Sequence, residues 1–322
     1  MDETGCLIQN SLFSDGKTTL WGGKYDISEE ERAYRDEEVI FIGHFQKHWG
    51  NFLFDCTTRM WYLFVTEKKC RLAYCAMDFD AKSFKEQTGY RKFLEMVGID
   101  PNRMLLIDHP TQFSNVIIPA LSGFPGQFYR DEYLYVFQKM MESVESRSDI
   151  RSYEKLYLTR ERMLNCKEIG EKWIENIFSN NGYHVIAPEE LTLEEQVYLI
   201  SHCKVFASIE GTTSHNILFA LNGTKHIILR KQNYINTRQI LFDEIKMIKP
   251  SYVDIFREPF RGFPLSHDAG PFWVGITKSL KCWMERERFK NNTSKCRYFF
   301  ESIKEFMIYT AKCIYYKYWL KY

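Results

Sequence analysis

The chain has 322 residues, of which 45% are hydrophobic, enough to build a packed core and too many for a disordered or low-complexity protein. Its 43 Lys and Arg residues against 42 Asp and Glu leave a net charge of +1, so no overall field points to nucleic acid as a partner. The nine scattered cysteines form no CxxC pair, and no apolar run approaches the ~20 residues that span a bilayer. We therefore expect a cytoplasmic protein.

The first half of the chain alternates between short apolar runs and helical patterns. The pattern predicts strands at 39–42, 71–77, 104–107 and 115–119, and helices at 52–65, 90–97 and 133–144. A polar stretch at 145–149 follows these elements. We place the end of a first domain there, at residues 1–149.

The second half shows a clearer alternation. It predicts strands at 156–158, 184–186, 205–209 and 226–229, and helices at 167–180, 193–202, 214–221 and 275–288, with Thr192 and Glu195 as a capping box. Strands separated by helices indicate βαβ units and a parallel sheet. The fold class is therefore α/β, with two Rossmann-like domains facing across a cleft and the second at 150–277. Ligands of such sheets bind beyond the carboxyl ends of the strands.

Two groups in the second half could bind an anion. The first, Glu210, Gly211, Thr212 and Thr213, lies between an apolar strand and a helix, where backbone N–H groups and the helix dipole favour phosphate. An ordinary strand-to-helix loop with a capping threonine has the same pattern. The second, Arg160, comes just after a predicted strand and could offer a bidentate guanidinium at the cleft, or be a solvated surface charge.

A third group lies in the first half. If a helix begins near Gly50, then Asn51, Asp55 and Arg59 share one of its faces, because they are four residues apart. Amide, carboxylate and guanidinium together could position and deprotonate a hydroxyl. A solvated Asp–Arg pair on a helix would look the same.

Two patterns could indicate a metal ion. Asp78-Phe79-Asp80 follows an apolar strand, which is the setting of a DxD metal motif, but so short a motif also arises by chance. His44 and His48 have the spacing of a helical metal pair but lack a third ligand at a convincing distance. We predict no metal site.

Four motifs occur together and in order. They are His48-Trp49-Gly50-Asn51-Phe52-Leu53-Phe54-Asp55 followed by Arg59, Tyr157-Leu158-Thr159-Arg160, Pro188-Glu189-Glu190-Leu191-Thr192-Leu193-Glu194-Glu195-Gln196, and Glu210-Gly211-Thr212-Thr213-Ser214-His215-Asn216. With these motifs the chain resembles glycosyltransferase family 61, most closely the bacterial members of capsular and surface polysaccharide clusters. The likeness spans roughly residues 37–231.

The resemblance implies a GT-B fold, a UDP-sugar donor held by the second domain, inversion at the anomeric carbon, and no required metal or other cofactor. Arg160 and the backbone from Gly211 to Thr213 would hold the diphosphate. Glu210 and His215 would approach hydroxyls of the donor sugar or ribose. The partners would be a nucleotide sugar and a glycan or glycolipid acceptor.

On the acceptor side, the resemblance makes Asp55 the best placed base, with Asn51 and Arg59 beside the acceptor. The family usually has histidine where this chain has Asn51, and asparagine cannot act as a base at neutral pH. His48 is therefore the alternative base. Two other functions stay open: a polysaccharide pyruvyltransferase that uses phosphoenolpyruvate, and a non-catalytic scaffold of a glycan-assembly complex.

The C-terminal segment, 278–322, combines a crossover helix with a basic, aromatic tail. It carries eleven Lys and Arg residues and four Glu, so its net charge is +7 and that of the rest is −6. Within 298–322 apolar residues recur at helical spacing, as in a helix that lies on an anionic membrane. We expect this tail to hold the enzyme on the inner face of the cell membrane; the alternative is a helix that packs on the domain through the same apolar stripe.

Overall fold

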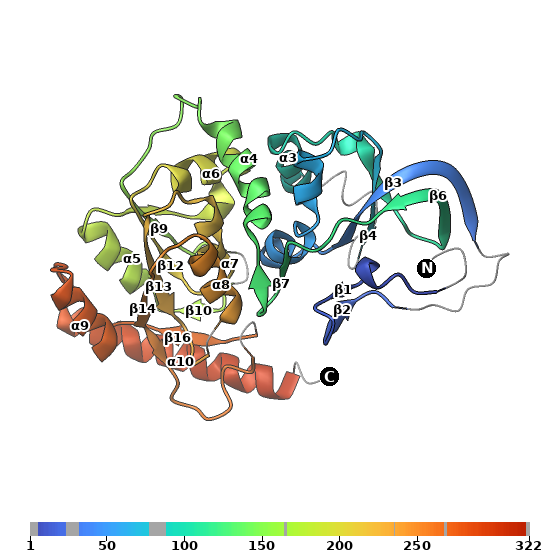
Figure 1. Cartoon of the computed structure of the whole chain (residues 1–322). Coiled ribbons are helices and arrows are strands. Elements are labelled where there is room, and N and C mark those ends of the chain that lie inside the picture. The colour runs from blue at the N-terminus through green and yellow to red at the C-terminus, as the bar shows by residue number, and fades with distance from the viewer. Residues whose placement is uncertain are drawn as a thin grey trace. The chain divides into compact units, whose positions relative to one another are not determined.

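The computed structural model describes residues 6–23, 32–76, 88–163, 166–234, 236–266 and 269–319. The chain divides into two compact units, Met1–Ser146 and Arg147–Tyr322, and each is described by itself (Figure 1). Both are mixed α/β structures built on a parallel sheet. Within the described ranges, no helix combines the length and the apolar character needed to cross a bilayer.

Unit 1 is built around a four-stranded sheet with the order β5-β4-β3-β6, in which every neighbouring pair is parallel. The central strand β3 buries Val39, Ile40 and Ile42, and aromatic rings that meet Phe52 edge to face fill the adjoining core. Its elements are η1 (Gln9–Ser11), β1 (Phe13–Ser14), β2 (Thr19–Trp21), β3 (Ala33–Phe45), α1 (Trp49–Asn51), η3 (Phe52–Cys56), η4 (Met60–Phe64), β4 (Arg71–Ala76), α3 (Thr88–Met96), η5 (Pro101–Arg103), β5 (Met104–Leu106), β6 (Thr111–Ile117), β7 (Gly123–Phe124), β8 (Phe128–Tyr129), η6 (Asp131–Leu134) and α4 (Tyr135–Val144).

The single helix expected at 52–65 is wrong. A short α-helix, α1, begins at Trp49 with His48 as its N-cap, and the chain then widens into the π-helix η3 before a turn and the 3-10 helix η4. A π-helix has more residues per turn than an α-helix, so the spacing of four no longer keeps side chains on one face. This irregular segment carries all the candidate residues of unit 1.

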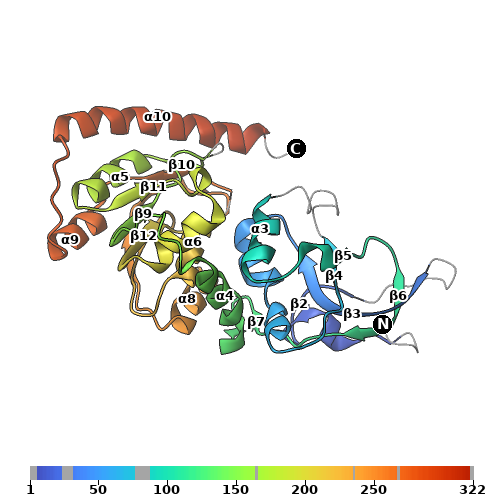
Figure 2. The same ribbon diagram turned by 90° about the horizontal axis from the view of Figure 1, so that it is seen from above.

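Unit 2 contains a five-stranded parallel sheet with the order β11-β9-β12-β13-β14. Helices α5 and α9 cover one face of the sheet with Ile174, Phe178, Leu280 and Trp283, and α8 lies on the other (Figures 1 and 2). Its elements are β9 (Lys155–Leu158), β10 (Glu168–Ile169), α5 (Glu171–Asn180), β11 (His184–Ile186), η7 (Pro188–Glu190), α6 (Leu193–Ser201), β12 (Val205–Ile209), α7 (Thr212–His215), η8 (Asn216–Phe219), β13 (Lys225–Arg230), α8 (Thr237–Ile245), β14 (Ser251–Asp254), β15 (Phe256–Arg257), β16 (Phe272–Val274), α9 (Lys278–Arg286) and α10 (Lys295–Trp319).

A second, three-stranded sheet, β10-β16-β15, lies in the same unit. The helix expected from residue 167 begins only at Glu171, because Glu168 and Ile169 pair with Phe272 and Trp273 of β16. The predicted capping box at Thr192 is confirmed: its side chain accepts from the backbone of Glu195, whose carboxylate accepts in return. These two sheets position the candidate donor residues.

Candidate functional site

The strand order of unit 2 defines where a ligand would bind. In chain order the five strands lie as 2-1-3-4-5, so the direction of winding reverses between β9 and β12. Open parallel sheets bind ligands at the carboxyl ends of the strands at this reversal point. Arg160 follows β9, Gly211 follows β12, and Lys231 follows β13, which pairs with β12. The topology thus brings these three residues to one edge of the sheet.

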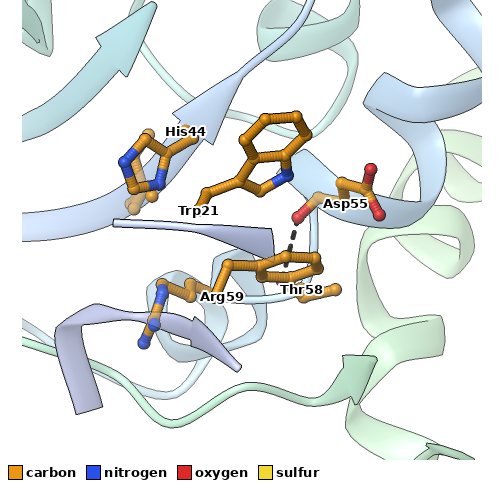
Figure 3. A pocket seen from close by; sticks show the side chains of 8 residues that line it. Trp21, His44, Asp55, Thr58 and Arg59 are labelled. Carbon is orange, nitrogen blue, oxygen red and sulfur yellow. Dashed lines mark hydrogen bonds between the residues drawn. The ribbon is translucent and has the colours of Figure 1, made fainter. Parts of the chain in front are cut away.

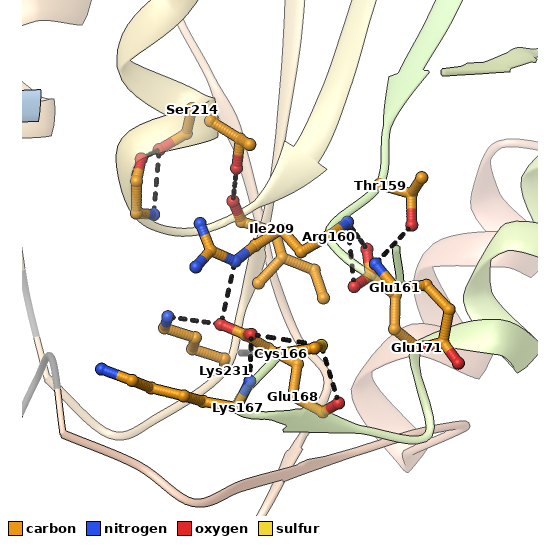
Figure 4. A network of polar contacts seen from close by, with 12 residues as sticks. Thr159, Arg160, Glu161, Cys166, Lys167, Glu168, Glu171, Ile209, Ser214 and Lys231 are labelled. Atoms are coloured by element: carbon orange, nitrogen blue, oxygen red, sulfur yellow. Dashed lines mark hydrogen bonds and ion pairs between the residues drawn. The ribbon is translucent and has the colours of Figure 1, made fainter. Parts of the chain in front are cut away.

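Arg160 and Lys231 share one buried carboxylate, that of Glu168 on β10 (Figure 4). The Glu168 Oε1 atom lies 2.7 Å from the Lys231 Nζ and 3.1 Å from the Arg160 Nε. The Lys231 ammonium also lies over the ring of Phe272, 4.2 Å from its centroid, and a Cβ placed on Gly211 would come within 3.7 Å of it. Two fixed cations therefore adjoin the turn at Gly211.

The ionisation of the nearby carboxyls leaves this cluster positive. Burial opposes the charge of Glu168, but Lys231 and Arg160 outweigh it and lower its pKa to about 2. Burial, and next the charge of Glu168, raise the pKa of Glu171 to about 8. Glu171 accepts hydrogen bonds from the Tyr157 hydroxyl at 2.8 Å and from the Arg160 backbone N–H at 3.1 Å. At neutral pH the two cations thus face one carboxylate, and the surplus positive charge favours an anionic ligand.

The turn after β12 offers fewer features for binding phosphate than the sequence suggests. Gly211 has φ 129°, a conformation that favours glycine, and its N–H donates to the Ser214 hydroxyl at 3.2 Å. Helix α7 is a single turn, so its dipole contributes little. The Thr213 hydroxyl donates to the Ile209 carbonyl, while Thr212 is half-exposed. Burial raises the pKa of Glu210 to about 7, so both of its protonation states are populated at neutral pH.

A buried polar chain holds this turn from behind. Gln239 Oε1 on α8 accepts from the Ser214 hydroxyl at 2.8 Å and lies 2.9 Å from His215 Nδ1. Gln239 Nε2 donates to Asp243, which in turn lies 2.8 Å from His226 Nδ1. His215 is therefore oriented by α8 through its Nδ1 atom. Its expected contact with donor hydroxyls stays a prediction.

In unit 1, Gln46 joins two of the candidate residues. Its amide accepts from Asn51 Nδ2 at 2.7 Å and donates to Asp55 Oδ2 at 3.2 Å. His48 lies at the start of α1, where its Nδ1 accepts from the Asn51 backbone N–H at 3.4 Å. Asp55 and Asn51 are thus connected, and His48 lies one helical turn before Phe52.

Arg59 does not join this group. Its side chain is 1% exposed and donates to the backbone carbonyls of Asn10, Leu12 and Pro119. Burial lowers its pKa to about 10, so it stays charged at neutral pH. Its guanidinium thus links the N-terminal segment to the residues after β6. The pattern in the sequence, which placed Arg59 on one helical face with Asp55, did not predict this structural role.

A small pocket lies between Arg59 and Asp55 (Figure 3). Its volume of about 10 Å³ has room for roughly one water molecule. His44 lines it from β3, and burial, together with the charge of Arg59, lowers its pKa to about 4. His44 is therefore neutral at pH 7. Since it lies in a strand and His48 caps a helix, the two do not form the helical metal pair considered above.

Among the residues described, no three His, Cys, Asp or Glu side chains gather as metal ligands would. The Asp78-Phe79-Asp80 triplet lies outside the described residues.

The structure adds site residues that the sequence did not suggest. Lys231 carried a usable signal, because it is the first residue after β13, as Arg160 comes soon after β9. Glu168 carried none: its two-residue strand pairs with residues more than 100 positions away and reads as the start of a helix. The roles of Gln46 and Gln239 could not be predicted from the sequence, because they depend on hydrogen bonds to residues that only the fold brings close.

Open parallel α/β sheets bind ligands at such a reversal point, and the cations there favour an anionic one. The model of the family Glycosyltransferase 61 matches residues 49–227, more than half of the sequence. The chain belongs to glycosyltransferase family 61, and its reaction is the transfer of a sugar to an acceptor.

No curated protein matches the chain. A solved structure, that of the bacterial iron-containing dodecameric glycosyltransferase TibC from enterotoxigenic E. coli, is similar at 12% identity with a TM-score of 0.31. The similarity covers 77% of this chain and 68% of that one.

Proposed function

We propose that the protein is an inverting glycosyltransferase of the GT-B type, which moves a sugar from a UDP-sugar to a hydroxyl of a surface-polysaccharide acceptor carried on a lipid. Unit 2 would bind the donor, and unit 1 would supply the acceptor-side residues. The observation that carries the proposal is the cluster at the sheet edge. Arg160 and Lys231 are held by the buried Glu168 beside the Gly211 turn, where a diphosphate would find two fixed cations.

The chemistry would be a single displacement. The acceptor oxygen attacks the anomeric carbon while the bond from that carbon to the UDP oxygen breaks, so the configuration inverts. Negative charge grows on the diphosphate as it leaves, and preorganised cations stabilise that charge without reorganising. Arg160 and Lys231 would thereby take the place of a divalent ion, which is why we propose that no metal is required.

A base must remove the proton of the acceptor hydroxyl. We assign this role to Asp55, because its carboxylate is buried and oriented by the Gln46 amide. A general base contributes about 10²–10⁴-fold to the rate when it is held in position. His48 stays the alternative, since its imidazole lies near the same segment.

The family membership favours glycosyl transfer over pyruvyl transfer from phosphoenolpyruvate. A non-catalytic scaffold would need no fixed cations at the donor end of the sheet. The two alternatives make different predictions for ligand binding: a pyruvyltransferase should be stabilised by phosphoenolpyruvate and not by UDP, and a scaffold by neither.

The test is titration calorimetry of UDP with the full-length protein and four variants. Arg160→Ala and Lys231→Ala should each weaken UDP binding by about 10- to 100-fold, because a hydrogen bond to a charged group is worth about 1.5–3 kcal/mol. Matched controls are Arg162→Ala, an exposed arginine paired with Glu190, and Lys225→Ala, at the amino end of the same strand β13. If all five proteins bound UDP with equal affinity, the cluster of Arg160 and Lys231 would not be part of the donor site.

A further inference from the structure

The C-terminal helix α10 packs on unit 2 through one of its faces (Figure 2). Tyr309 and Cys313 are buried against Ile169 of β10, with Phe260, Phe263 and Trp273 around them. Glu305 accepts from the Trp173 indole N–H at 2.9 Å, and the Tyr298 hydroxyl accepts from the Ile276 backbone N–H at 2.7 Å. Of the apolar stripe expected from the sequence, Phe306 takes part in this packing, against the rings of Phe260 and Trp273.

Most of that expected stripe is left on the outside, together with Phe300. Large apolar side chains at successive intervals of three, four, seven and four residues lie on one side of a helix. We call Phe300, Ile303, Met307, Ile314 and Tyr318 the outer stripe; their exposed fractions are 65%, 44%, 59%, 55% and 63%. Soluble proteins seldom leave so many large apolar side chains together in water, so the outer stripe points to a binding surface.

The charges around the outer stripe have one sign. Arg297, Lys304 and Lys317 are exposed beside it. The two carboxylates of α10 are Glu301 and Glu305; both are half-buried, and Glu305 is bonded to Trp173 on the packed side. A partner for this surface must therefore be both apolar and anionic.

We propose that the outer stripe of α10 docks the protein on an anionic phospholipid bilayer, with the helix lying in the plane of the interface. Phospholipid supplies both properties at once: acyl chains to take the aromatic and aliphatic side chains, and anionic headgroups for the lysines and arginines. A second copy of this chain on the same face would bring like charges together with no carboxylate to meet them. This inference is independent of the identity of the donor.

The experiment is sedimentation of the full-length protein with vesicles of phosphatidylcholine alone or mixed with phosphatidylglycerol. We expect binding to the anionic vesicles only, weakened but not abolished by salt, since the apolar contribution is not screened. Lys304→Gln should weaken binding by about fivefold, because one near-surface cation is worth about 1 kcal/mol. Phe300→Ser/Met307→Ser should weaken it by tenfold or more.

The matched control is Tyr34→Ser/Leu221→Ser, which removes two large apolar side chains with exposed fractions of 64% and 56% outside α10. It should bind anionic vesicles like the unchanged protein. Both double variants should keep the thermal midpoint and the UDP affinity of the parent, because all four side chains are largely exposed. Retained UDP binding also separates this test from that of the proposed function.

Three results would overturn the proposal. The parent protein could ignore anionic vesicles even at low salt, or the Phe300→Ser/Met307→Ser variant could bind them as the parent does. Light scattering could instead show a dimer that this variant converts to a monomer, without vesicle binding, in which case the outer stripe is a contact between copies.

Discussion

Two arginines of this chain, Arg59 in unit 1 and Arg160 in unit 2, are both charged and both largely buried, yet their surroundings differ. Arg59 donates to three main-chain carbonyls that belong to segments far apart in the sequence. Arg160 faces a carboxylate that it shares with Lys231, and its side chain keeps 14% exposure. The Arg59 guanidinium keeps its charge but donates its hydrogen bonds to main-chain carbonyls of the fold, whereas Arg160 lies in a cluster with surplus charge.

The comparison shows how a structural arginine differs from one that can bind a ligand. Carbonyl oxygens saturate a guanidinium and tie it to the fold, so its removal should act on stability. A carboxylate shared between two cations holds them in place without cancelling them, so removal of either cation should act on binding. Both residues lie in the segments that resemble the family, and the sequence alone does not separate their roles.

The largest effect should come from Arg59→Ala. We expect it to lower the free energy of unfolding by about 3–5 kcal/mol, because two buried carbonyls and one part-buried carbonyl lose their donor and a cavity is left. Urea denaturation measures this change. Arg160→Ala should cost about 1 kcal/mol by the same measurement, since Lys231 still neutralises Glu168.

Arg91→Ala is the control for Arg59→Ala, because Arg91 is an exposed residue of unit 1 that pairs with Glu95 in α3. Its loss should change stability by less than about 0.5 kcal/mol. If Arg59→Ala were as mild as this control, or milder than Arg160→Ala, the distinction between the two arginines would fail.

The next effect concerns the pocket beside Arg59. Asp55→Asn should lower kcat by about 10²-fold or more while UDP affinity changes little, because the amide cannot accept the proton of the acceptor. Transfer rates and calorimetry on the same preparation separate the two. If His48→Ala abolishes transfer and Asp55→Asn does not, the base is His48.

A smaller effect, on stability, depends on pH. Glu171 has a pKa of about 8 in the folded protein, against 4.5 as the ordinary value. Because the folded state holds the proton more tightly, its stabilising contribution is complete below about pH 4.5 and is lost as pH rises towards 8. Glu171→Gln should flatten the fall in stability over this window, since glutamine can still accept from Tyr157 and Arg160. An unchanged slope in urea titrations from pH 5 to 8 would contradict it.

Removal of divalent metal ions is expected to have no effect on the rate of transfer. Treatment with EDTA should leave transfer intact, and so should Asp78→Ala, because in our proposal Arg160 and Lys231 stabilise the leaving diphosphate. A requirement for Mn²⁺ or Mg²⁺ to restore turnover would assign that role to the Asp78-Phe79-Asp80 triplet instead.

Four of the five strands in the larger sheet of unit 2 were predicted almost to the residue, whereas β14 and the three strands of the second sheet were not. The expected strands at 184–186 and 205–209 have the observed bounds of β11 and β12. Strands of a parallel sheet that is covered on both faces form continuous apolar runs, and the intervening helices have capping signals such as Thr192. The position of Arg160 and of the Gly211 turn followed from these bounds.

The rest depended on contacts between distant residues. No local pattern in the segment from Phe52 to Cys56 predicts a π-helix. The pairing of Glu168 with Phe272 joins two residues that are too far apart in the sequence for any local pattern to relate them. The wheel of α10 has apolar residues on more than one side. The sequence therefore indicated an amphipathic helix but not which side would pack, and the structure buries Tyr309 and exposes Phe300.

The strand β10 consists of two residues, and each has a different neighbour. Glu168 holds the cations Arg160 and Lys231, and Ile169 contacts α10 through Tyr309 and Cys313. One peptide bond thus separates the residue that holds the cation cluster from the residue on which α10, the helix of the outer stripe, packs. Thermodynamic linkage makes any communication between them mutual: the factor by which vesicles change the affinity for UDP must equal the factor by which UDP changes the affinity for vesicles. Both affinities can be measured. A common factor different from one would show that the two sites are coupled, with β10 as the structural link, and a factor of one would show that they are independent.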